Sequence, residues 1–256
     1  MSTSYGLLGI GSIARAIVTG LCEGVAAPPR AILSPRGAAT SAELAERYDA
    51  VSVAPDNQAV LDASQVVVVC LPVAAADQLG ALSWRPDHVV VSATAALGMP
   101  RLLELVAPAT RACRSVPMPP VADRAGLTAV HPPLAEARAL FDRLGGTLEV
   151  EDVTAYEALS ATSATLAGFF AYLDTQAAWL RTQGISAADG SRYVAATYAG
   201  ALGSLRSADP PDFAELAGEY ATPGGVNEQV ARELREAGAF DALTTALDGA
   251  LLRLAT

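Results

Sequence analysis

The sequence predicts an α/β fold: a doubly wound parallel sheet in the N-terminal part, followed by an all-helical C-terminal part. Short apolar segments alternate with amphipathic ones over the first 150 residues, and Gly-x-Gly-x-x-Ala directly follows the first apolar segment. From Val153 onward the sequence is rich in alanine and helix-like. Several apolar runs show no alternation, which is typical of strands covered on both faces of a parallel sheet.

The first element is an apolar strand at Gly6–Ile10 that runs into the motif Gly9-x-Gly11-x-x-Ala14. Gly9 allows a tight turn, Gly11 lets the backbone approach a pyrophosphate, and Ala14 lets the next helix pack close to the strand. The N-terminus of that helix then faces the phosphates. Strand, glycines and helix come in the order of a Rossmann-type dinucleotide site, and the alternative is a plain structural turn.

The second strand, Ala31–Ser34, ends without the Asp or Glu that NAD-binding proteins place there for the ribose 2′-hydroxyl. Ser34 offers a hydrogen-bond donor, and Arg36 offers a planar cation that suits a 2′-phosphate. These residues favour NADP(H) over NAD as the cofactor. The alternative for Arg36 is a solvated arginine in a surface turn.

Four further strands are expected, at Val51–Val53, Val66–Leu71, His88–Ser92 and Cys113–Val116, and helices such as Ser41–Tyr48 and Arg101–Val106 lie between strands. The carboxyl ends of the strands of a doubly wound sheet line the binding crevice. The predicted cofactor-binding residues are therefore Gly9, Gly11, Ser12, Ile13, Ser34, Arg36, Leu71, Pro72 and Ala93.

The character of the sequence changes after Gly145-Gly146, which predicts a dinucleotide-binding domain at residues 1–150 and a helical domain at 151–256. The helical domain carries breaks at Asp209-Pro210-Pro211 and Pro223-Gly224-Gly225. The apolar faces of these helices are larger than the helices can cover by packing against one another, which predicts a dimer interface. A self-contained helical bundle is the alternative. The expected helices are Thr154–Gly168 continuing to Gln183, Ser186–Leu205, Phe213–Glu219, and Asn227 to the end.

Composition excludes several classes of function. The net charge is −10 and no basic stripe is present, so we expect no nucleic-acid partner. The chain has no lysine, which excludes Schiff-base chemistry and a Walker lysine. No apolar run approaches the ~18 residues of a membrane span, so we expect no membrane partner. The three cysteines lie far apart, which predicts neither a metal cluster nor a disulfide framework and indicates a cytoplasmic protein.

The order of these landmarks resembles the pyrroline-5-carboxylate reductase family over nearly the whole chain. Besides the N-terminal motif, residues 114–120 (RSVPMPP) resemble that family's Arg-x-Met-Pro-Asn-Thr-Pro segment, and residues 222–227 (TPGGVN) resemble its Ser-Pro-Gly-Gly-Thr-Thr loop. The resemblance implies a Rossmann domain, a helical dimerisation domain that forms a homodimer or a higher oligomer, and an active site between the two. It also implies a role in proline biosynthesis.

The chain departs from the family at several positions. Met118 replaces an asparagine, Asn227 replaces the threonine that contacts the substrate imine, Leu71-Pro72 replaces Lys-Pro, and residues 160–164 (SATSA) replace Ser-Gly-Ser-Gly-Pro. The family reaction is therefore only one of three readings. The others are a reductase of a different imine or carbonyl in secondary metabolism, and a non-catalytic NADP-binding sensor or scaffold.

Hydride transfer from a nicotinamide requires placement of the acceptor carbon and polarisation of the atom bonded to it. A cyclic imine is easily protonated, so a strong protein acid is not required. In the 222–227 loop, backbone N–H groups at a helix start can hold a carboxylate, although an ordinary interhelical turn is the alternative. We predict an NADPH-dependent reductase of the C=N bond in a small cyclic imine acid, with catalytic Asn227 and Thr222 and substrate-binding Gly224, Gly225, Val226 and Met118.

Overall fold

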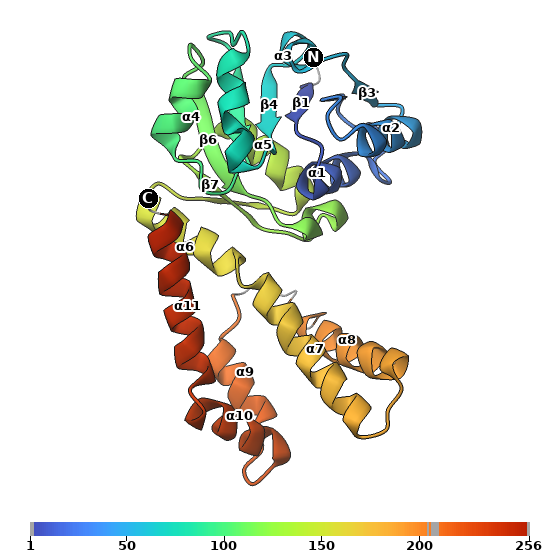
Figure 1. Ribbon diagram of the computed structural model, residues 1–256, viewed down its shortest axis with the longest axis vertical. Coiled ribbons are helices and arrows are strands. Elements are labelled where there is room, and N and C mark those ends of the chain that lie inside the picture. Colours follow the sequence, from blue (N-terminus) through green and yellow to red (C-terminus); the bar gives the residue numbers. More distant parts are fainter. Residues whose placement is uncertain (1–2, 204, 206–209, 255–256) are drawn as a thin grey trace. The chain divides into compact units, whose positions relative to one another are not determined.

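The computed structural model describes residues 3–203, 205 and 210–254. The chain forms two compact units (Figure 1). One contains the residues up to Ser163 and a short stretch from Arg253, and the other is Ala164–Leu252. The sequence predicts a domain boundary at residue 150, and this boundary stays a prediction. Residue 204 of the expected helix Ser186–Leu205, Asp209 of the expected break and the last two residues lie outside the described part.

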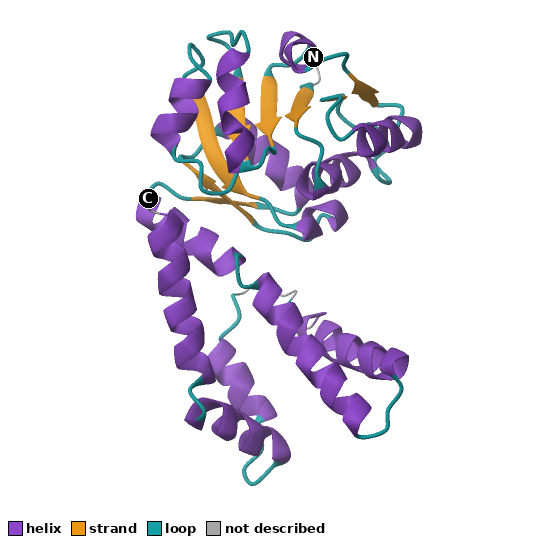
Figure 2. Ribbon diagram, in the orientation of Figure 1, coloured by secondary structure: helices purple, strands orange, loops and turns teal. Residues whose placement is uncertain are grey.

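The first unit is built on an eight-stranded sheet in the order β3-β2-β1-β4-β5-β6-β7-β8 (Figure 2). The chain changes direction across the sheet between β1 and β4, so the crevice of a doubly wound sheet is expected at their carboxyl ends. The strands are β1 (Tyr5–Leu8), β2 (Ala31–Leu33), β3 (Val51–Val53), β4 (Val66–Val69), β5 (Val89–Ser92), β6 (Arg111–Val116), β7 (Thr128–His131) and β8 (Thr147–Glu149).

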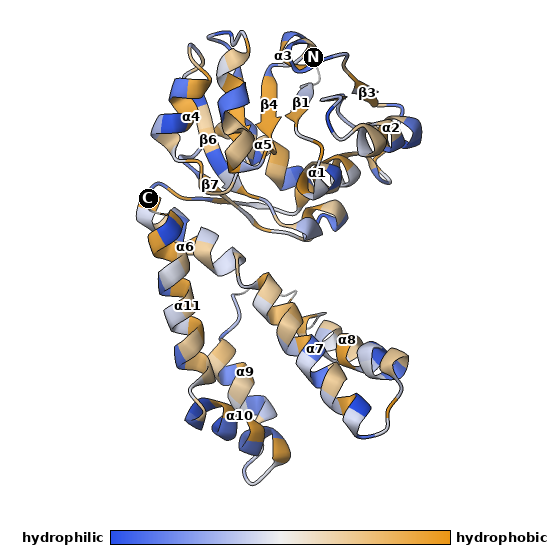
Figure 3. Cartoon of the chain, in the orientation of Figure 1, coloured by the Kyte–Doolittle hydropathy of each residue, from blue (hydrophilic) through white to orange (hydrophobic). Residues whose placement is uncertain are grey.

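Two apolar clusters cover the two faces of the sheet, because successive side chains of a strand point to opposite faces. Leu7 of β1 belongs to one cluster and Leu8 to the other. The central strands are accordingly apolar along their length (Figure 3). The helical segments of this unit are α1 (Ser12–Cys22), α2 (Ala38–Arg47), α3 (Asn57–Asp62), η1 (Val73–Ala81), α4 (Met99–Leu105), η2 (Pro119–Asp123), α5 (Ala135–Phe141), η3 (Asp142–Leu144) and α6 (Val153–Ser163).

The predicted doubly wound parallel sheet is confirmed, with one antiparallel junction near its end. The pairs from β3 to β6 are parallel, whereas β6 and β7 are antiparallel, with Arg114 opposite His131. Neither β7 nor β8 was expected from the sequence. Both are short and carry polar residues, so they lack the continuous apolar run that marks the buried strands.

The second unit is entirely helical in its described residues: α7 (Leu166–Thr182), α8 (Ala187–Gly203), α9 (Phe213–Tyr220), α10 (Val226–Glu236) and α11 (Ala239–Leu254, whose last residues belong to the first unit). Among those residues, only Gly190 and Val194 are buried. Large apolar side chains such as Phe170, Trp179 and Leu252 are more than half exposed, at 63%, 61% and 72%. Within the described residues of this unit, the helices therefore leave large apolar side chains exposed.

Two further features of the described residues bear on function. No helix among them is both long enough and apolar enough to cross a membrane. They also contain no group of three or more His, Cys, Asp or Glu side chains placed to hold a metal ion.

Candidate functional site

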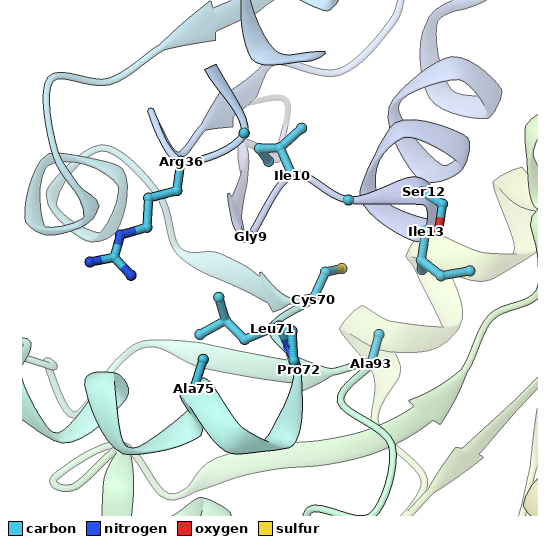
Figure 4. Close-up of a pocket in the computed structure, with 12 residues that line it drawn as sticks. Gly9, Ile10, Ser12, Ile13, Arg36, Cys70, Leu71, Pro72, Ala75 and Ala93 are labelled. Carbon is cyan, nitrogen blue, oxygen red and sulfur yellow. The ribbon is translucent and has the colours of Figure 1, made fainter. Parts of the chain in front are cut away.

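A cavity of about 470 Å³ opens at the carboxyl ends of β1, β4 and β5 and beside the turn that follows β2 (Figure 4). Its volume lies within the range of ~300–1,000 Å³ that is usual for small-molecule and cofactor sites. Eight of the nine predicted cofactor-binding residues line the cavity, and Ser34 does not. The lining residues are Gly9, Ile10, Gly11, Ser12, Ile13, Arg36, Gly37, Cys70, Leu71, Pro72, Ala75 and Ala93.

The glycines of the first turn have separate roles. Gly9 has a φ of +86°, and a Cβ there would lie 2.9 Å from the carbonyl oxygen of Cys70, so only glycine fits. A Cβ on Gly11 would meet nothing within 4 Å, which leaves open space above the backbone at this point. Gly11 is also the N-cap of α1 and offers no side chain to cap the helix. The first-turn N–H groups of α1 are therefore free to bind an anion.

Arg36 is the one charged side chain among the described residues that line the cavity. Its Nη1 donates a hydrogen bond to Oε1 of Gln78 on η1, and this contact orients the guanidinium. The other N–H groups of the guanidinium remain available for an anion, since the group carries five donors. The close-up shows Arg36 extending from its turn on the side of the view opposite Ser12 and Ile13 (Figure 4).

Ser34 lies beneath this turn and is fully buried. Its hydroxyl donates to Oδ1 of Asn57, at 2.7 Å, and accepts from the backbone N–H of Arg36, at 3.2 Å. Ser34 therefore shapes the turn that presents Arg36, while Asn57 at the start of α3 secures Ser34. Sequence reasoning missed Asn57 and Gln78, because both lie on elements distant from the turn in the chain.

Cys70 also lines the cavity, at the end of β4. Desolvation by burial raises the pKa of its thiol to about 12. The thiol therefore stays protonated near neutral pH and acts as a small apolar contact rather than as a nucleophile.

The second set of predicted residues meets in the turn between α9 and α10 of the second unit. Gly224 has a φ of +76°, and Gly225 is the N-cap of α10. Thr222, Val226 and Asn227 are exposed there. Met118 belongs to the first unit, where it is the half-buried N-cap of η2.

Several polar groups of this turn already have partners within it. The N–H of Gly225 donates to the carbonyl of Thr222, at 2.8 Å. The N–H of Gly224 donates to Oε2 of Glu228, at 2.7 Å, and Nδ2 of Asn227 donates to the carbonyl of Tyr220, at 3.2 Å. A carboxylate from the chain itself therefore occupies one N–H group that the sequence assigns to a substrate carboxylate. Sequence reasoning missed Glu228, although its place three residues after the N-cap is typical of a capping glutamate.

Comparisons with known families match the N-terminal and C-terminal parts of the chain to two different family models. Residues 4–96 match the family described as NADP oxidoreductase coenzyme F420-dependent, and residues 152–256 match the pyrroline-5-carboxylate reductase dimerisation family. A pyrroline-5-carboxylate reductase from Corynebacterium melassecola is 24% identical over 253 residues, which span 92% of each of the two chains.

Solved structures share the fold over almost the full length. The 1-pyrroline-5-carboxylate reductase of Streptococcus pyogenes has a TM-score of 0.81 at 21% identity and covers 98% of this chain and 97% of its own. The enzyme of Coxiella burnetii gives 0.80 at 22% identity, covering 99% and 97%. The Plasmodium falciparum pyrroline carboxylate reductase, solved with NADP bound, gives 0.79 at 14% identity, covering 99% and 97%.

Proposed function

We propose that the chain is a divergent oxidoreductase of the pyrroline-5-carboxylate reductase family that uses NADPH to reduce the C=N bond of a small cyclic imine. Pyrroline-5-carboxylate is the first candidate substrate, and its reduction would serve proline biosynthesis. The observation that carries this proposal is the cavity at the sheet switch point, where a glycine turn, a helix N-terminus and one arginine face the same space.

The residues that line the cavity fit a dinucleotide. The turn at Gly9–Gly11 and the N-terminus of α1 would hold the pyrophosphate, and Arg36 would hold a 2′-phosphate. Pro72 and Ala93, at the ends of β4 and β5, would border the nicotinamide half. When bound, the reduced cofactor supplies a hydride to the acceptor carbon.

The substrate loop at Thr222–Asn227 supplies polar groups that suit an imine. One N–H of the Asn227 amide is used by Tyr220, and the amide carries a second N–H that can donate to the substrate. Such a donor acts on the atom where charge changes during reduction. Thr222 offers a hydroxyl in the same loop.

One observation favours a second candidate, a reductase whose substrate lacks a carboxylate. The carboxylate of Glu228 accepts the hydrogen bond of the Gly224 N–H. An anionic substrate placed on this loop would have to displace that carboxylate or lie beside it, and like charges repel. An uncharged or protonated cyclic imine meets no such penalty.

Turnover with a small panel of acceptors tests the proposal. We expect purified protein to oxidise NADPH in the presence of a cyclic imine, either pyrroline-5-carboxylate or unsubstituted 1-pyrroline, and not in the presence of keto acids. The absorbance of NADPH measures the reaction. Turnover only with a carbonyl acceptor would contradict the imine assignment, and tight NADPH binding without turnover on any acceptor would favour a sensor or scaffold.

The helical unit predicts an obligate homodimer. Its helices leave large apolar side chains exposed and match the dimerisation family, so a second copy is expected to cover them. Sedimentation at low micromolar concentration should show no monomer. A stable monomer with normal cofactor binding and turnover would overturn this prediction.

A further inference from the structure

A buried ion pair joins the sheet of the first unit to α6. Nη1 of Arg114 on β6 lies 2.5 Å from Oε1 of Glu157, and the two side chains are 5% and 8% exposed. The guanidinium carbon of Arg114 also lies 4.7 Å from the ring centre of Tyr156, the residue before Glu157. The ring of Tyr156 in turn contacts His131, the neighbour of Arg114 on β7.

Stability does not account for this pair. Taking both charges out of water is costly, and their attraction compensates only when the remaining donors and acceptors are also satisfied. Among the described residues, Nε of Arg114 and Oε2 of Glu157 have no hydrogen-bond partner. In other proteins, apolar side chains of similar size often stabilise the fold as well as such a pair or better. Places that depart from such rules in native proteins are expected to serve function.

The position of the ion pair near the cavity indicates what function it serves. Arg114 is in register with Ser92 at the end of β5, and the next residue, Ala93, lines the cofactor cavity. Ser115 ties the same two strand ends together, because its hydroxyl donates to the carbonyl of Ser92 at 3.1 Å. Two residues beyond Arg114, β6 ends and the segment that leads to Met118 begins.

We propose that Arg114 and Glu157 are positioning residues for hydride transfer. Anchored by Glu157 and Tyr156, Arg114 holds the end of β6, and with it residues 116–118, beside the nicotinamide side of the cavity. The inference rests on the proposed function and adds to it a device that fixes the distance between cofactor and substrate. Hydride transfer is sensitive to such placement, because an error of ~1 Å can cost ~100-fold in rate.

The test removes both charges together. Arg114→Met combined with Glu157→Met is expected to fold with wild-type thermal stability or better, since no unpaired charge remains. We expect kcat to fall at least ~10-fold, while the Kd for NADPH stays within ~2-fold. Glu157→Gln alone is expected to lower both stability and kcat, because it leaves the guanidinium buried without its partner.

A matched control lies on the same strand. Arg111, at the amino end of β6, pairs with Glu136 at 2.5 Å, and both side chains are partly exposed. Arg111→Met combined with Glu136→Met should leave kcat unchanged. This pair has the same chemistry as Arg114 and Glu157 but lies at the end of β6 remote from the cavity.

Hydrogen exchange of the NADPH-bound protein provides a readout that needs no substrate. In the variant lacking both charges, amides of residues 114–123 should exchange at least ~10-fold faster than in the wild type. Wild-type exchange there, or a wild-type kcat in the stable variant, would overturn the proposal. If the double variant fails to fold, Glu157→Asp takes its place, because it keeps the charge and shortens its reach. The same measurements of kcat and hydrogen exchange then test the proposal. If the wild type reduces no acceptor, the proposed function fails, and the exchange data still test separately whether the ion pair holds the end of β6.

Discussion

Replacing Arg36 by alanine is expected to weaken NADPH binding at least ~10-fold and to leave NADH binding nearly unchanged, because a charge-assisted contact to phosphate contributes ~1.5–3 kcal/mol. Arg36 is the charged residue among those that line the cavity, and Gln78 and the turn at Ser34 hold it in place. The Kd for each cofactor is measured by titration of the protein, monitored by calorimetry or by nicotinamide fluorescence.

A matched arginine separates this contact from a general loss of positive charge. Arg101 on α4 pairs with Asp77 and Glu104 and does not line the cavity, so Arg101→Ala should leave both cofactors unaffected. The Arg36 effect should also weaken as salt is added, because screening reduces an exposed charge interaction. Equal losses for NADPH and NADH would contradict the assignment of Arg36 to the 2′-phosphate.

The position of the cavity that we assign to the cofactor was largely predictable, because the sequence signals for it are local. Gly9, Gly11 and the helix after them lie within a few residues of one another, and each glycine meets a steric demand of the turn. The role of Ser34 could not be predicted from local sequence in the same way. Its hydroxyl donates a hydrogen bond to Asn57, 23 residues further along the chain, and no local sequence pattern predicts that contact.

The ion pair of Arg114 and Glu157 shows a second limit of sequence reasoning. The two residues are 43 positions apart and meet only because α6 packs against the end of the sheet. A signal was present, since an arginine interrupts the apolar strand between Cys113 and Ser115. A charged residue within a buried strand indicates that a partner exists, although the sequence does not identify the partner.

Replacing Asn227 by alanine is expected to lower kcat and kcat/KM together, by ~100-fold or more, because the lost donor matters most as charge changes on the acceptor atom. Gly225→Val should act differently and mainly raise KM, since a Cβ at Gly225 would already lie 2.8 Å from the carbonyl of Thr222 and distort the turn. Steady-state kinetics on the active cyclic imine separate the two effects. Unaltered kinetics for Asn227→Ala would remove this residue from the active site, and most of the case for the loop with it.

We propose that Glu228 and Asn227 together decide which imine the loop accepts. If the substrate carries a carboxylate, Glu228→Gln should lower KM for pyrroline-5-carboxylate, because it removes a like charge from the loop and leaves only a neutral acceptor at the N–H of Gly224. If the substrate lacks a carboxylate, the same change should leave its KM unchanged or raise it. Asn227→Thr restores the residue of the family loop. A gain in activity on pyrroline-5-carboxylate would indicate a pyrroline reductase whose loop sequence has diverged from that of the family. A loss of native activity without that gain would instead mean that Asn227 serves a different acceptor.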